Sequence, residues 1–82
     1  MVVRAFVLIE VKIGAIQTVA HILRSVQGIK SVDIITGPFD IIALIEGRNV
    51  QDVVASVVEE RIRTVPGIIK TSTCISINSR PV

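Results

Sequence analysis

A turn that leads into an almost entirely apolar strand lies near the middle of this chain and constrains how its neighbours can pack. Gly37 and Pro38 interrupt the pattern, and six of the seven residues from Phe39 to Ile45 are apolar. Such a run predicts a buried strand. Asp40 is the exception. Its carboxylate either closes the turn by accepting hydrogen bonds from backbone N–H groups or is available to bind a cation. The sequence leaves both possibilities open.

Hydrophobic periodicity predicts the other elements. Together with the central run, it indicates strands at Val2–Lys12, Ile29–Thr36, Phe39–Glu46 and Ile68–Asn78. A helical period indicates helices at Gly14–Val26 and from Val50 to about Arg63. Gly28 is expected to stop the first helix, and Ser79–Val82 is expected to be a tail.

The two predicted helices differ in composition. The first has an apolar stripe made of Ile16, Val19, Ala20, Leu23 and Val26, with His21 on the solvent side. The stripe of the second consists almost wholly of valine: Val50, Val53, Val54, Val57 and Val58. Valine is a poor helix former, so tertiary packing must hold this helix. Asn49 is the expected N-cap. Glu59 and Arg63 form an i, i+4 pair, and the run from Glu59 to Arg61 is expected to be a solvated helix end.

The first strand indicates that both faces of its sheet must be covered. One face is apolar throughout: Val3, Ala5, Val7, Ile9 and Val11. The other is polar at its ends and apolar at its centre: Arg4, Phe6, Leu8, Glu10 and Lys12. We therefore expect a partner on the second face as well.

The order strand, helix, strand, strand, helix, strand predicts an α+β, ferredoxin-like βαββαβ fold in a single domain over residues 1–82. The short Gly37–Pro38 connection requires an antiparallel hairpin, and two right-handed crossovers then share one four-stranded antiparallel sheet. Both helices cover the same face. Two copies are expected to pack through the helix-free face and bury Phe6 and Leu8 as a dimer interface.

Composition narrows the functional classes. Half of the residues are hydrophobic and the mean hydropathy is +0.70, which favours association for so short a chain. No apolar run approaches the roughly 18 residues of a membrane span, and no signal peptide is recognised, so neither membrane nor secretion is expected. The lone Cys74 excludes an internal disulfide, indicates a reducing, cytoplasmic setting and is expected to be buried and inert. A net charge of +2, scattered basic residues and the absence of Trp and Tyr argue against direct nucleic-acid binding.

Two motifs give the sequence a family resemblance that covers the whole chain. Thr36-Gly37-Pro38-Phe39-Asp40 is similar to a Gly-x-aromatic-Asp turn, and Val65-Pro66-Gly67 followed by Ile68 to Thr73 is similar to a helix exit and a Thr-x-Thr strand. Both, in this order and spacing, resemble the ligand-binding domain of the Lrp/AsnC (leucine-responsive regulatory protein) family, also called the regulation-of-amino-acid-metabolism domain. Usual members carry a preceding helix-turn-helix domain, whereas this sequence begins at the first strand and so resembles the stand-alone version. Many relatives have Tyr where Phe39 stands.

The resemblance implies a role in regulating transcription or amino-acid metabolism without a DNA-binding domain of its own. It implies homodimers that assemble further, typically to octamers, and possible co-assembly with full-length Lrp/AsnC regulators. It also implies an amino-acid effector bound where dimers meet. The ligand-binding residues it points to are Gly37, Phe39, Asp40, Thr71 and Thr73. No cofactor or metal is implied.

The chemistry of these residues suits an amino acid. An aspartate can take the ammonium by charge-assisted hydrogen bonds. Gly37 lets backbone N–H groups approach the carboxylate, and threonine hydroxyls can donate or accept. The alternative for each is structural: Asp40 only closes its turn, and Thr71 and Thr73 are ordinary strand residues.

Two other functional classes remain. An enzyme would need a catalytic constellation, and Glu10 with Asp40 is the one candidate carboxylate pair; the sequence shows no nucleophile–base set, phosphate loop or metal cluster. A pure assembly module would join related regulators without binding a ligand. The sequence does not separate the assembly module from the effector sensor.

Overall fold

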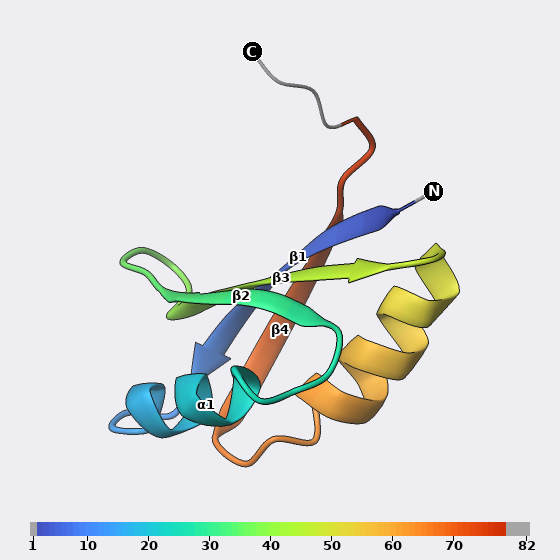
Figure 1. Ribbon diagram of the computed structural model, residues 1–82. Coiled ribbons are helices and arrows are strands. Elements are labelled where there is room, and N and C mark those ends of the chain that lie inside the picture. Colours follow the sequence, from blue (N-terminus) through green and yellow to red (C-terminus); the bar gives the residue numbers. More distant parts are fainter. Residues whose placement is uncertain (1, 79–82) are drawn as a thin grey trace.

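The computed structural model describes residues 2–78, which form one four-stranded sheet and two helices (Figure 1). In chain order the elements are β1 (Val3–Val11), α1 (Ile16–Leu23), β2 (Ile29–Ile34), β3 (Ile41–Gly47), η1 (Asp52–Ile62) and β4 (Ile68–Ile75). The strand order is β2-β3-β1-β4, and every neighbouring pair is antiparallel. The predicted ferredoxin-like fold is confirmed. The predicted tail, residues 79–82, lies outside the described residues.

Strict alternation along the two central strands builds the core on one face of the sheet. The side chains of Ala5, Val7, Ile9, Ile41, Ala43 and Ile45 are fully buried. They form one cluster with Val19, Ala20 and Leu23 of α1 and with the buried residues of η1. Both helices therefore cover the same face, as the fold prediction requires.

The opposite face carries the apolar centre that the sequence indicated. Phe6 lies opposite Leu44 in the β1–β3 ladder, and Leu8 lies opposite Ile42. All four are at least partly exposed, Phe6 to 39%. Arg4 and Glu46 close one end of this face with an ion pair at 2.9 Å.

Cys74 also lies on the helix-free face, because it stands opposite Phe6 in the β1–β4 ladder. The expectation of a buried thiol is wrong: Cys74 is exposed. β4 is an edge strand, and no helix covers this side of it. A period-two pattern places the residue on a face but does not say whether that face is covered.

The first helix is shorter than predicted. α1 begins at Ile16 and ends at Leu23, because the next turn tightens: Val26 N–H donates to the carbonyl of Leu23, three residues back, at 3.1 Å. The Ser25 hydroxyl also donates to the Ile22 carbonyl at 2.7 Å. Gly28 follows in the left-handed region at φ +98°, which fits its predicted role as a stop. Within residues 2–78, neither helix has the length and hydrophobicity needed to cross a membrane.

The second helix differs in kind from the prediction, since η1 is a π-helix. Arg63 N–H donates to the carbonyl of Val58, five residues back, at 2.9 Å. The wider turn buries Val53, Val57, Val58 and Ile62, while Val50 is 50% exposed. Valine gives little α-helical preference, so packing on the sheet decides the pitch. Asn49 makes the contact predicted for it, because the Asp52 N–H donates to Asn49 Oδ1 at 2.8 Å, although the residue that directly precedes η1 is Gln51.

The connection between β2 and β3 is longer than predicted, although the hairpin is antiparallel as expected. β2 ends at Ile34 and β3 begins at Ile41, so residues 35–40 form the turn. Gly37 has φ +134°, which favours glycine. Pro38 has no N–H to continue the ladder, so regular pairing stops before it and resumes after Asp40.

Candidate functional site

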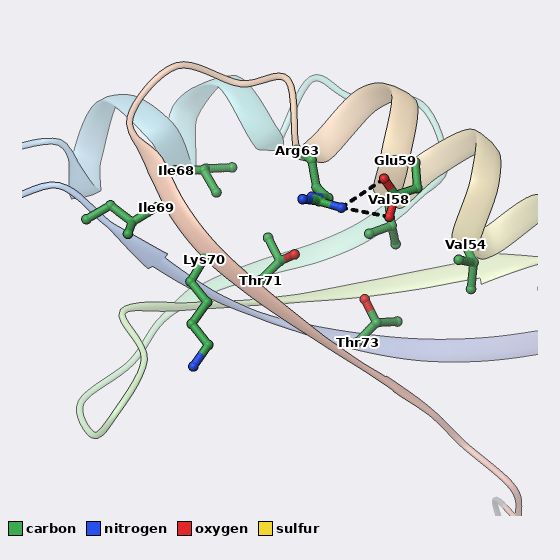
Figure 2. A pocket seen from close by; sticks show the side chains of 9 residues that line it. All are labelled: Val54, Val58, Glu59, Arg63, Ile68, Ile69, Lys70, Thr71 and Thr73. Carbon is green, nitrogen blue, oxygen red and sulfur yellow. Dashed lines mark hydrogen bonds and ion pairs between the residues drawn. The ribbon is translucent and has the colours of Figure 1, made fainter.

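A cleft of about 640 Å³ opens between η1 and the edge strand β4 (Figure 2). η1 and the turn after it contribute Val54, Val58, Glu59 and Arg63. β4 contributes Ile68, Ile69, Lys70, Thr71 and Thr73. The cleft thus contains two of the five predicted ligand-binding residues.

Strand register explains why both threonines point toward the helices. Thr71 lies opposite Ile9 and Thr73 opposite Val7, both of which belong to the core. Directly opposite residues share a face of the sheet. Figure 2 shows both threonine side chains rising from β4 toward η1. Among residues 2–78, no further strand pairs with the outer side of β4. The two hydroxyls therefore line an open cleft, whereas the residues opposite them on β1 lie in the packed core.

A register shift in the β1–β4 ladder shapes the mouth of the cleft. Glu10 pairs with Lys70, but the next residue, Val11, pairs with Ile68. Ile69 is therefore the extra residue of a β-bulge, a feature that bends a strand and re-aims its side chains. Ile69 is 58% exposed. An exposed aliphatic side chain thus stands at the edge of the cleft.

The predicted pair of Glu59 and Arg63 is confirmed and lies in this cleft. Arg63 Nη1 donates to Glu59 Oε2 at 2.9 Å and to Oε1 at 3.0 Å. Figure 2 shows the pair above Thr71 and Thr73, with both contacts made by one nitrogen of the guanidinium. Both side chains are about half exposed, so the pair by itself adds little to stability. The expectation that Glu59 belongs only to a solvated helix end is incomplete.

The predicted turn residues lie outside the cleft lining. A Cβ added at Gly37 would meet nothing within 4 Å, so the backbone there is open to close approach. Phe39 is half-buried and Pro38 is exposed. The turn is accessible, and it contributes no residue to the cleft between η1 and β4.

Asp40 has a structural partner on the neighbouring strand. Its Oδ2 accepts the backbone N–H of Val11 at 2.9 Å. Its own N–H donates to the carbonyl of Ile9, and its carbonyl accepts from Ile35, both at 2.9 Å. The second carboxylate oxygen has no hydrogen-bond partner among residues 2–78. The carboxylate therefore extends the β1–β3 pairing, and one of its oxygens stays available.

The two groups of predicted residues do not meet in one chain. Asp40 contacts β1 from the β3 side, whereas Thr71 pairs with β1 from the other side. Two strand spacings of about 4.8 Å place their backbones about 10 Å apart. Within one chain the turn residues are therefore not part of the cleft.

Sequence reasoning missed the aliphatic walls of the cleft, Lys70 and the position of Glu59 and Arg63. Their proximity depends on how η1 lies against β4, which no local pattern encodes. The sequence did contain one signal for this site: Glu59 and Arg63 have i, i+4 spacing, and the next predicted strand has alternating threonines.

The carboxylates of the enzyme alternative have different partners. Asp40 accepts from Val11, while Glu10 lies opposite Lys70 in the β1–β4 ladder. Over residues 2–78, no three His, Cys, Asp or Glu side chains gather in a way that could hold a metal ion. A second hollow of about 330 Å³, which includes Arg48 and Arg61, contains none of the predicted site residues.

Comparisons with known proteins show which domains share this sequence pattern and fold. The family model described as the Lrp/AsnC ligand binding domain matches residues 4–80. A comparison with curated proteins found no match. The structure of FFRP-DM1 is 31% identical, with a TM-score of 0.84, and the match covers 92% of this chain and 99% of that one. TTHA0845 from Thermus thermophilus is 25% identical, with a TM-score of 0.86 and coverage of 98% and 99%.

One more distant structure was solved with a small molecule. The transcriptional regulator NMB0573 from Neisseria meningitidis, in complex with L-Met, is 13% identical with a TM-score of 0.73. The match covers 98% of this chain and 53% of the regulator. At that identity the likeness shows the fold alone.

Proposed function

Because this chain belongs to the Lrp/AsnC ligand-binding domain family, we propose that it is a single effector-binding and assembly domain whose effector is an amino acid. It acts in the regulation of transcription or of amino-acid metabolism. The observation that carries the proposal is the cleft between η1 and β4, in which Thr71 and Thr73 lie beside a charged pair. A cleft of about 640 Å³ is in the range of about 300–1,000 Å³ typical of small-molecule sites.

The effector lies between copies of the chain. The turn of one copy supplies Gly37, Phe39 and Asp40, and the cleft of another supplies Thr71 and Thr73. The ammonium binds the available oxygen of Asp40 by a charge-assisted hydrogen bond. Gly37 supports this arrangement because a Cβ built at this position would meet nothing within 4 Å, so a ligand can approach the backbone closely. The L-Met complex of NMB0573 supports an amino acid as the ligand class.

Assembly begins with a dimer through the helix-free face. The apolar centre of Phe6, Leu8, Ile42 and Leu44 is only partly buried in one chain, and its rim holds the Arg4–Glu46 ion pair. An apolar centre with a polar rim is typical of a protein interface. Further association of dimers, to an octamer, brings the turn of one dimer to the cleft of the next. Full-length Lrp/AsnC regulators are the partners that share this interface.

The domain acts in the cytoplasm and does not itself bind DNA. Its net charge is +2, and the apolar sides of α1 and η1 are used against the sheet. Specific DNA binding normally needs a basic surface and an element that enters a groove.

A calorimetric screen of the amino acids against the parent protein and Asp40→Asn tests the proposal. We expect one amino acid to bind the parent and to raise its melting temperature with concentration. Asp40→Asn keeps the shape and one acceptor but removes the charge, so it should weaken binding by about 1.5–3 kcal/mol. Equal binding to both proteins would place the ammonium elsewhere.

A pure assembly module is the second candidate, and one contact favours it. The Asp40 carboxylate already has a structural task, because it accepts the Val11 N–H. If no amino acid binds the parent in the screen, the assembly role takes the place of the sensor role.

A further inference from the structure

We infer that the cleft between η1 and β4 binds the carboxylate of a small aliphatic acid through the unused edge of the Arg63 guanidinium. The inference rests on the proposed function in taking this cleft as one half of the effector site. It assigns the carboxylate to an arginine side chain of the cleft, and not to the backbone of the turn.

The free edge follows from how Arg63 meets Glu59. Both contacts use Nη1, at 2.9 and 3.0 Å from the two carboxylate oxygens. A guanidinium has five N–H donors, and Nε and Nη2 carry the other three. Among residues 2–78 these donors have no hydrogen-bond partner. Two parallel N–H groups on one edge match a carboxylate in the bidentate manner.

The unused hydrogen-bond donors of Arg63 favour an anion over a cation in the cleft. Glu59 and Arg63 are the charged pair of the cleft, whereas Lys70 lies opposite Glu10 on the helix-free face and its ammonium points away from η1 (Figure 2). Each oxygen of Glu59 already accepts a hydrogen bond from Arg63, whereas the Nε and Nη2 donors of Arg63 are unused among residues 2–78. A ligand ammonium would therefore compete with Arg63 for Glu59, whereas a ligand carboxylate would meet unused donors. In this arrangement the ammonium of an amino acid points out of the cleft, toward Asp40 of another copy.

Neutral groups complete the site. Thr71 and Thr73 present hydroxyls below Arg63 (Figure 2), and a hydroxyl can donate to a carboxylate oxygen. Aliphatic side chains flank this polar centre, Val54 and Val58 on η1 and Ile68 and Ile69 on β4. This arrangement suits a short aliphatic body that ends in a carboxylate.

Three probes separate the two ends of the ligand. L-leucine carries both charged groups, 4-methylpentanoate has the carboxylate alone, and 3-methylbutylamine has the ammonium alone. Calorimetry on the parent should show binding of 4-methylpentanoate and none of 3-methylbutylamine. If the amine binds as tightly as the acid, or if neither carboxylate binds, the inference is wrong.

Variants of the ion pair give the sharper test. Arg63→Gln should weaken the binding of 4-methylpentanoate roughly tenfold to a hundredfold, since a hydrogen bond to a charged group is lost. Arg63→Lys keeps the charge but loses the two parallel N–H donors, so its affinity for 4-methylpentanoate should lie between those of the parent and Arg63→Gln. Glu59→Gln removes the competing anion and should tighten binding. Arg48→Gln, which removes the same charge outside the cleft, is the matched control and should bind like the parent.

The outcomes distinguish this inference from the proposed function. If 4-methylpentanoate binds through Arg63 but no amino acid binds, the amino-acid function fails and the carboxylate site stands. If an amino acid binds the parent and Arg63→Gln equally, the effector function stands and the role of Arg63 is refuted.

Discussion

At the scale of single residues, the carboxylate of Asp40 joins the turn before β3 to the end of β1. One oxygen accepts the Val11 N–H at 2.9 Å. The other has no partner within the described chain. A structural task and a ligand-binding task can therefore coexist in one side chain, each using a different oxygen.

Two substitutions of Asp40 separate these tasks. Asp40→Ala removes the acceptor and leaves the part-buried Val11 N–H without its partner, so it should lower the free energy of unfolding by about 1–3 kcal/mol. Asp40→Asn retains an acceptor for the Val11 N–H, so its free energy of unfolding should be closer to that of the parent. Urea denaturation at equal protein concentration measures both. Equal stability of Asp40→Ala and the parent would show that the contact with Val11 contributes nothing.

The residues of the site were predictable to different degrees. The sequence placed Thr71 and Thr73 on one face of a strand, because alternation is a local property. The resemblance supplied their link to a ligand. It could not show that Arg63 lies above them, since that contact depends on the packing of η1 against β4.

At the scale of elements, the strands and their order followed from the sequence, whereas the pitch of the second helix did not. Alternation in Val3–Val11 fixed which side chains of β1 are buried. A valine run has no strong preference of its own, and an α-helical stripe was only the default expectation. The structure has a π-helix, η1, in which Ile62 is fully buried, and Val50, two residues before it begins, is half exposed.

The observed π-helix and the expected α-helical stripe predict different burial, and so different stability effects, for Ile62 and Val50. Ile62 is fully buried, so Ile62→Ala should cost about 2–5 kcal/mol of stability. Val50 is half exposed, so Val50→Ala should stay within about 0.5 kcal/mol of the parent. Denaturation curves recorded at one protein concentration compare them. A larger loss for Val50→Ala than for Ile62→Ala would support the α-helical stripe instead.

At the scale of the whole molecule, the proposed assembly depends on the helix-free face. Phe6 and Leu8 were singled out from the polar–apolar–polar pattern of one strand, and the ladder adds Ile42 and Leu44 beside them. The pattern indicated that another chain should cover this face. It could not show how that chain is oriented, because the orientation depends on contacts between two copies.

A charge at the centre of that face should prevent the dimer. Leu8→Glu would place an unpaired carboxylate in the interface, at a cost of several kcal/mol. Thr18→Glu adds the same charge on the exposed side of α1 and is the control that should assemble like the parent.

Native mass spectrometry of the gently purified parent protein, beside Leu8→Glu and Thr18→Glu, tests the central claim most directly. We predict an even-numbered assembly of the parent and of Thr18→Glu that retains an amino acid, and a monomer without ligand for Leu8→Glu. A parent that is monomeric, or an assembly that carries no amino acid even when amino acids are added, would contradict the account of an effector-binding assembly domain.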